Sequence, residues 1–280
     1  MTPGSGGAVG PDPWVQRHWD WRAAGNFIGG GAGSGLILFA ALGDTQGAPL
    51  VAALLGGLAL VGAGLLCVWL EIGRPWRALN VFVNLRTSWM SREAAVAALL
   101  VPVTLAAAAG IPLARALAVV LAGAFLFAQS RILRAARGIP AWRAPLAAPL
   151  VVVTGLVEGG GLWLAIGALS GAPTPPLAWV WAALLIARFL LWPAYVRPLP
   201  ERARRALEPA GRTLRWLGTA LPFALIALDA MRPGPATAWL ALAGVAAALT
   251  GSRVKHALVT RASFNQGFAL ARLPVRGARP

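Results

Sequence analysis

Eight long apolar runs dominate the sequence and restrict its fold more than any single motif does. They cover residues 24–42, 50–70, 93–109, 113–134, 146–169, 176–196, 212–230 and 236–256. A hydrocarbon core about 30 Å thick needs about 20 apolar residues per helix, whereas membrane barrels alternate apolar and polar residues. With 58% hydrophobic and 12% charged residues among 280, the composition excludes a soluble domain. We therefore predict an all-α integral membrane protein, a bundle of eight transmembrane helices.

The positions of the lysines and arginines support this number of spans. Of the 25 such residues, 23 fall in connections on one side of the membrane, and only Arg115 and Arg232 fall on the other. The positive-inside rule then places both termini in the cytoplasm. We expect a tail with an interfacial anchor over residues 1–22, a transmembrane domain over 23–256 and a cytoplasmic tail over 257–280. The net charge of +16 therefore reflects topology, and it does not indicate nucleic-acid binding.

Two charged residues interrupt the apolar runs at matching depth. Glu158 and Arg188 each lie about 12 residues, or about 18 Å, from the start of consecutive antiparallel runs. An isolated charge at this depth costs at least about 2.5 kcal/mol, so we predict that the two side chains form an intramembrane ion pair, either in direct contact or through a single water. The pair could simply fix two helices, or Glu158 could take part in proton or quinone chemistry, because intramembrane acids commonly relay protons.

The first apolar run carries small residues and one amide. Gly25, Gly29 and Gly33 are spaced four residues apart along one helical face. Such a face lets two helices approach closely, or it leaves room for a bound ring. Asn26 lies near the cytoplasmic end of this run, where its amide needs a partner. Either a hydrogen bond within the protein or a ligand would supply that partner.

The chain offers few ligands for a redox centre of its own. The single cysteine, Cys67, lies in an apolar run, so a cysteine-ligated cluster is excluded. A membrane haem usually needs paired histidines inside the bundle, but His18 precedes the first run and His256 ends the last. We expect no metal in this chain. His18 is close enough to the first run to be a minor candidate for proton exchange.

A polar and basic stretch, WLEIGRPWRALNVFVNLRTSWMSRE, separates the second and third runs. Gly73 and Pro75 end the preceding helix, and the following apolar residues predict an amphipathic turn at the membrane interface. Ser88 is suited to cap the next helix, and Glu93 is predicted to be the acidic residue of its first turn. The arginines of the stretch are explained either by phospholipid contact or by docking of a partner.

This stretch resembles the signature loop of the membrane anchor subunit of dimethyl sulfoxide reductase. The matching residues are Leu70, Gly73, Arg74, Pro75, Ala78, Asn80, Ser88, Trp89, Ser91, Arg92 and Glu93. The C-terminal stretch KHALVTRASFNQGFALARLPVRG is also similar to the tail of this family, which belongs to the broader group of polysulfide and nitrite reductase anchors. The opening WDWRAAGNFIGGGAGSG resembles, more weakly, the anchors of phenylacetyl-CoA:acceptor oxidoreductases.

The resemblance implies a quinone-reactive anchor in the bacterial inner membrane, with menaquinone or ubiquinone as its substrate. Its partners would be an iron–sulfur subunit and a molybdopterin catalytic subunit, which hold the metal cofactors. Because the basic connections face the cytoplasm in the predicted topology, we expect the partners there. The candidate docking residues are Arg77, Arg86, Arg92, Arg134 and Arg202.

We predict the quinone site at the cytoplasmic ends of the first two runs. Asn26 or Arg74 would donate a hydrogen bond to a quinone carbonyl, and Glu71 would exchange protons with the cytoplasm. His18 could assist, and Glu158 would be a deeper acid of the same site. Glu71 could instead be a plain ion-pair partner of Arg74.

Two other functions remain open at this point. A secondary transporter would use Glu158 and Arg188 as its substrate or proton site, with the glycine-rich first and fifth runs as corresponding halves of a repeat. The first run has no acidic counterpart to Glu158, which argues against this function. A passive anchor without a quinone site would differ only in activity.

Overall fold

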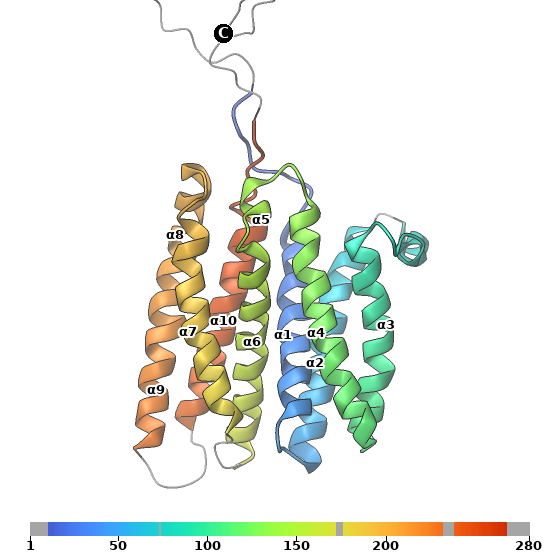
Figure 1. Ribbon diagram of the computed structural model, residues 1–280, viewed down its shortest axis with the longest axis vertical. Helices are drawn as coiled ribbons and strands as arrows, with labels where there is room; N and C mark the ends of the chain where they lie inside the picture. The colour runs from blue at the N-terminus through green and yellow to red at the C-terminus, as the bar shows by residue number, and fades with distance from the viewer. Residues whose placement is uncertain (1–10, 73, 172–175, 232–237, 268–280) are drawn as a thin grey trace, which may run out of the picture.

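The computed structural model describes residues 11–72, 74–171, 176–231 and 238–267. They form a bundle of antiparallel helices (Figure 1). The long α-helices are α1 (Trp21–Leu42), α2 (Gly47–Glu71), α3 (Trp89–Ala108), α4 (Pro112–Ala135), α6 (Ala147–Leu169), α7 (Leu177–Val196), α8 (Glu201–Arg215), α9 (Leu221–Ala230) and α10 (Ala238–Thr260). Shorter elements are the 3₁₀-helix η1 (Pro75–Phe82), the single turn α5 (Pro140–Arg143) and the π-helix η2 (Trp216–Ala220).

Among the described residues, six helices are long and apolar enough to cross a membrane: α1, α2, α3, α4, α6 and α7. The seventh predicted run instead lies in α8, η2 and α9, which follow one another without a break while η2 changes the hydrogen-bond register. The eighth run is α10, which is 23 residues long but carries Arg253 and Lys255. The structure therefore supports a multi-pass helical membrane protein, with six spans by length and composition.

One end of the bundle gathers the basic connections, and we call it the basic end. It comprises the starts of α1, α3, α6 and α8 and the ends of α2, α4, α7 and α10 (Figure 1). Both terminal segments leave the bundle here and pair with each other. A β-bridge joins Val15 to Phe264, and the backbone N–H of Gln16 donates to the Ser263 carbonyl at 3.0 Å.

Helix α1 lies in the interior of the bundle, against α2, α4, α6 and α10. Its predicted glycine face packs on α2: a Cβ at Gly29 would collide with the Leu60 carbonyl, and one at Gly33 with the Gly57 carbonyl. Gly35 makes a similar approach to α6 at Gly155. The glycine spacing thus serves close helix packing, one of the two functions predicted for it.

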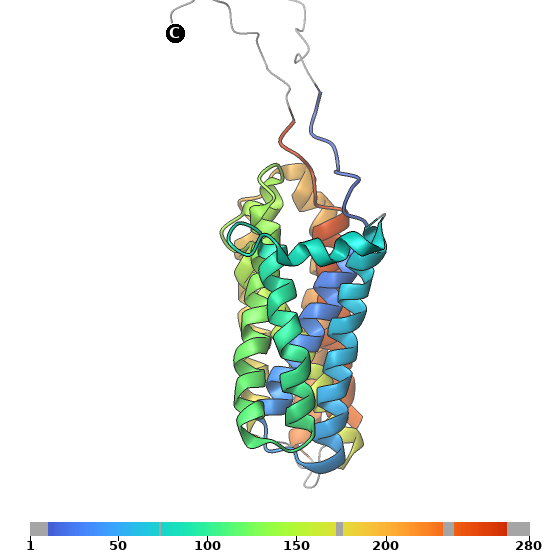
Figure 2. The ribbon, with the colours of Figure 1, turned by 90° about the vertical axis from the view of Figure 1, so that its right-hand side faces the viewer.

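The stretch between α2 and α3 folds as the amphipathic element η1, which crosses the basic end at a steep angle to the helices (Figure 2). Trp76 and Val83 expose their apolar side chains there. Ser88 caps α3 as predicted, because its Oγ accepts a hydrogen bond from the Ser91 N–H at 3.3 Å. Glu93, however, lies beyond the first turn of α3, and its side chain is buried.

Candidate functional site

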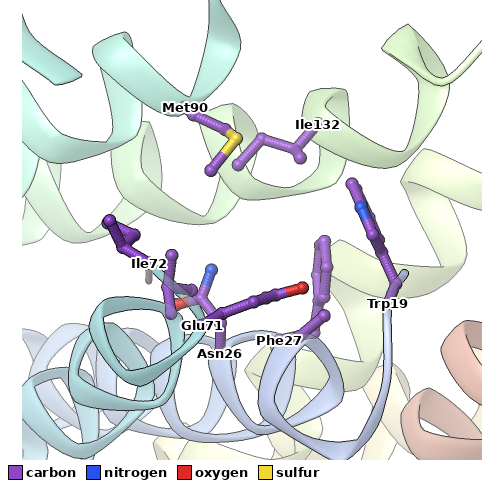
Figure 3. A pocket seen from close by; sticks show the side chains of 9 residues that line it. Trp19, Asn26, Phe27, Glu71, Ile72, Met90 and Ile132 are labelled. Atoms are coloured by element: carbon purple, nitrogen blue, oxygen red, sulfur yellow. The ribbon is translucent and has the colours of Figure 1, made fainter. Parts of the chain in front are cut away.

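A cavity of about 200 Å³ opens at the basic end between α1, α2, α3 and α4. Its wall consists of Trp19, Ala23, Asn26, Phe27, Val68, Glu71, Ile72, Met90 and Ile132. Met90 and Ile132 lie on one side, opposite Asn26, Glu71 and Phe27 (Figure 3). The cavity is therefore largely apolar and aromatic, with one amide and one carboxylate as its strongly polar groups.

Local interactions hold the polar groups of this cavity in place. Asp20 caps α1 by accepting a hydrogen bond from the Arg22 N–H at 2.8 Å. The Arg22 guanidinium donates to the Leu70 carbonyl at 3.1 Å and so ties the start of α1 to the end of α2. The structure thereby brings Asn26 and Glu71, two residues of the predicted site, into one cavity.

The aromatic wall is also fixed by packing. The Trp19 ring stacks on Trp142 with centroids 4.7 Å apart, and it lies 6.2 Å from the Phe27 ring. The Trp142 indole donates to the Leu258 carbonyl of α10 at 2.9 Å. Flat aromatic rings are therefore already in position to contact a flat ligand.

Behind Asn26 lies a buried polar cluster that the sequence did not reveal. The side-chain amide of Asn26 donates to the two carboxylate oxygens of Glu93 at 3.3 and 3.5 Å, and the Gln129 side chain donates to the backbone carbonyl of Asn26 at 2.9 Å. The three residues are at most 4% exposed. Asn26 Oδ1 and Gln129 Oε1 lack a partner among the described residues, so the cluster has more acceptors than donors. Two features of the sequence could have indicated this cluster: Gln129 lies inside an apolar run, and Glu93 is an acid at the start of another.

Two other predicted residues do not line the cavity. Arg74 is exposed and precedes η1, and His18 is exposed in the segment before α1. The backbone N–H of His18 donates to the Gln16 side chain at 2.9 Å.

Among the described residues, Glu158 and Arg188 do not form a direct ion pair. Glu158 pairs with Lys255 of α10, with Nζ and Oε2 2.5 Å apart, and the lysine also donates to the Phe27 carbonyl at 2.8 Å. Both side chains are buried. Ser252 lies 3.5 Å from the other carboxylate oxygen. Lys255 lies at the end of the last apolar run, where a lysine normally contacts solvent, so its position in the sequence does not indicate a buried ion pair.

Arg188 is held instead by two backbone carbonyls, those of Gly218 at 2.7 Å and Ala247 at 3.0 Å. In a regular α-helix the Gly218 carbonyl would accept from residue 222, which is Pro222 and has no N–H. The π-helix η2 and this proline leave the carbonyl free, so the arginine occupies it. This backbone effect explains why Arg188 does not need Glu158 as its partner.

Glycines on the inner side of α1 make room for the buried polar side chains. A Cβ at Gly30 would collide with the Gln129 amide, and a Cβ at Gly31 with Lys255 Nζ. The glycine content of α1 thus has a second function that the four-residue spacing did not predict.

The predicted docking arginines differ in their surroundings. Arg77, Arg86 and Arg134 are exposed at the basic end. Arg92 donates to the carbonyls of Leu85 and Arg86 and lies 4.3 Å above the Trp89 ring. Arg202 donates to the Pro13 carbonyl at 2.8 Å and pairs with Asp12 at 3.5 Å. Arg92 and Arg202 therefore bind within the chain, whereas the side chains of the first three have no hydrogen bond or ion pair within the described ranges.

The model of the DMSO reductase anchor subunit (DmsC) family matches residues 22–191, well over half of the chain. The chain belongs to this family. A DmsC-type protein is a multi-pass membrane anchor subunit of a molybdopterin oxidoreductase, in association with catalytic and iron–sulfur subunits. The matched region begins at the start of α1, and all of the cavity wall except Trp19 lies within it. No match was found among the curated proteins.

Proposed function

We propose that this DmsC-type anchor exchanges electrons and protons with a membrane quinone in the cavity lined by Asn26 and Glu71. This proposal rests on one observation: the basic end contains a cavity with aromatic walls, one buried amide and one carboxylate. Electrons would pass between the quinone and the iron–sulfur subunit docked at this end. Menaquinone or ubiquinone would be the substrate, and the iron–sulfur clusters and the molybdopterin would belong to the partner subunits.

The chemistry of the wall suits both forms of a quinone. The flat ring would lie among Trp19, Phe27 and Met90. With one amide hydrogen of Asn26 donated to Glu93, the second would be the donor to a quinone carbonyl, and Oδ1, which lacks a partner among the described residues, would be the acceptor for a quinol hydroxyl. One amide can therefore bind the oxidised and the reduced ring.

Glu71 is the group we assign to proton exchange. It ends α2 at the basic end, and its side chain is only partly buried, so it contacts both the cavity and the surface. A positioned carboxylate contributes about 10²-fold or more to a proton-transfer step. Glu93 lies one hydrogen bond behind Asn26 and would stabilise the orientation of that amide.

Glu158 does not line the cavity, and we assign it a structural function. Its ion pair with Lys255 joins α6 to α10, and the hydrogen bond from Lys255 to Phe27 extends the link to α1. Arg74 and His18 also lie outside the cavity wall. We place both at the surface facing the partner subunits or the lipid headgroups.

The proposed topology has eight spans, with the basic end in the cytoplasm of a bacterial inner membrane. It is supported by the alternation of basic connections, and by α8 to α9 and α10, which extend along the same bundle (Figure 1). Arg77, Arg86 and Arg134 are then available to the partner subunits. The similarity to phenylacetyl-CoA:acceptor oxidoreductase anchors stays a prediction.

The test uses the tagged full-length chain, purified from its native host with its partner subunits. Glu71→Gln should lower quinone-linked turnover by about 10²-fold, while assembly and the dye-linked activity of the catalytic subunit stay unchanged. Asp44→Asn, an exposed acid after α1 at the opposite end, is the matched control and should have no effect.

Three results would contradict the proposal. Full turnover in the Glu71→Gln complex would remove the proton function of this residue. An intact complex without any quinone turnover would indicate a passive anchor. Purification as a single subunit that moves a solute would indicate a transporter.

A further inference from the structure

A second concave surface lies at the basic end, between α7 and α8 and away from the quinone cavity. It is a groove of about 560 Å³. The α7 side is apolar and includes Phe189, Trp192 and Val196. The α8 side is charged, and in total four arginines and two glutamates line the groove. The groove thus combines an apolar floor with an excess of positive charge.

Internal ion pairs neutralise part of this charge but leave two arginines free. Glu201 pairs with Arg204 and Arg205, and Glu208 lies 4.0 Å from Arg212, which is outside the groove. Arg197 and Arg215 are exposed, and neither guanidinium forms a hydrogen bond or ion pair within the described part of the chain. An anion bound in the groove would therefore meet two uncompensated cations.

The depth of Arg215 indicates where that anion comes from. Arg215 precedes the end of α9 by 15 residues, which is about 22 Å along the helix, less than the roughly 30 Å of a hydrocarbon core. Its neighbours Trp216 and Leu217 are 70% and 52% exposed, so this side of the helix faces outward. In the proposed topology the guanidinium must extend toward the headgroups or pair with a negative group of the membrane.

We propose that this groove binds an anionic phospholipid of the phosphatidylglycerol type. The phosphate would bind Arg197 and Arg215, because guanidinium groups form strong paired hydrogen bonds with phosphate oxygens. The acyl chains would cover the accessible apolar side chains of Phe189 and Val196 and continue over the outward-facing Trp216 and Leu217. Basic pockets between membrane helices are known sites for acidic headgroups.

The apolar floor distinguishes a lipid from other anions. Free phosphate would satisfy the two arginines but would leave the accessible side chains of Phe189 and Val196 uncovered. An acidic protein segment would match the charge, but the floor continues onto side chains that face outward beside α9. A diacyl phospholipid satisfies both parts of the groove.

The test measures lipid binding to the full-length chain after delipidation, by native mass spectrometry with added phosphatidylglycerol or phosphatidylcholine. The wild type should bind phosphatidylglycerol at least about tenfold more tightly, and the double variant R197Q/R215Q should lose this preference. R134Q, an exposed arginine at the same end but outside the groove, is the matched control and should retain it. R197K/R215K keeps the charge but loses the paired hydrogen bonds, so its affinity should lie between those of the wild type and R197Q/R215Q.

Several outcomes would overturn the proposal. These are unchanged phosphatidylglycerol binding by R197Q/R215Q, equal binding of both lipids by the wild type, and complete displacement of the lipid by inorganic phosphate. Loss of the partner subunits from R197Q/R215Q with lipid binding intact would assign the groove to a protein interface instead. Loss of phosphatidylglycerol binding by R134Q as complete as that by R197Q/R215Q would show a general effect of surface charge, and the site would be rejected.

Discussion

The side-chain amide of Asn26 donates to the buried carboxylate of Glu93 at 3.3 Å, across 67 positions of sequence. This hydrogen bond links α1 to α3 directly behind the proposed quinone cavity. The buried carboxylate depends on the amide, since leaving a buried polar group unpaired costs about 1–3 kcal/mol. The pair therefore connects the stability of the bundle to the geometry of the cavity.

Exchanging the two groups tests this relationship. Asn26→Asp places two carboxylates together and should lower the free energy of unfolding by about 2–4 kcal/mol. The double variant N26D/E93Q restores an amide donor opposite a carboxylate and should recover at least half of that loss. Thermal unfolding of the purified chain gives the comparison, and equal losses in the single and double variants would contradict a direct interaction.

Gly31 should tolerate no larger residue, because a Cβ there would collide with Lys255 Nζ. Gly31→Ala should cost about 1–3 kcal/mol of stability, since inserting atoms into a packed interior forces neighbouring groups to move. Gly62→Ala is the matched control: it lies in α2, where an added Cβ would meet no packed neighbour within 4 Å, so it should lose no stability and should gain up to about 1 kcal/mol because alanine favours the helix. Equal unfolding temperatures of the two variants would show that the lysine adjusts freely.

Removing one partner of the Glu158–Lys255 ion pair should lower the stability of the protein more than removing both. Lys255→Met leaves a fully buried carboxylate without its cation and should cost about 3–5 kcal/mol. The double variant E158Q/K255M removes both charges and should be more stable than K255M alone. Chemical unfolding in detergent measures the difference, and a double variant that loses the sum of both single effects would argue against a coupled pair.

Asp20 should make the folding stability of the chain depend on pH in the acid range. The hydrogen bond from the Arg22 guanidinium holds the pKa of this carboxyl below its usual range. Because the folded-state pKa is the lower one, the stabilisation is complete above the unfolded-state pKa of about 3.9 and is lost as the pH falls through the folded value. Asp20→Asn should therefore be less stable than the wild type at pH 7, and the difference in unfolding temperature should shrink below about pH 4. A difference that stays constant from pH 7 to pH 3 would exclude this contribution.

Much of the architecture follows from local properties of the sequence. The length of an apolar run and the positions of arginines are local properties that do not depend on how helices pack. The helical class, the loop at the basic end and the Ser88 cap could therefore be predicted from the sequence alone. The same reasoning put Asn26 and Glu71 at one end of neighbouring helices, where the structure joins them in a cavity. Arg74 and His18 lie outside the wall of this cavity, since a position near the end of a span does not make a side chain face inward.

The sequence by itself determined that Glu158 and Arg188 lie deep in apolar helices and need partners, because charge in hydrocarbon is costly wherever it occurs. Only the tertiary structure decided what those partners are. Glu158 meets Lys255 because α6 packs on α10, and Arg188 meets the Gly218 carbonyl because Pro222 cannot donate to it. Depth along a helix is a local quantity, whereas the choice of partner depends on which helices are neighbours and on how each helix is rotated about its axis.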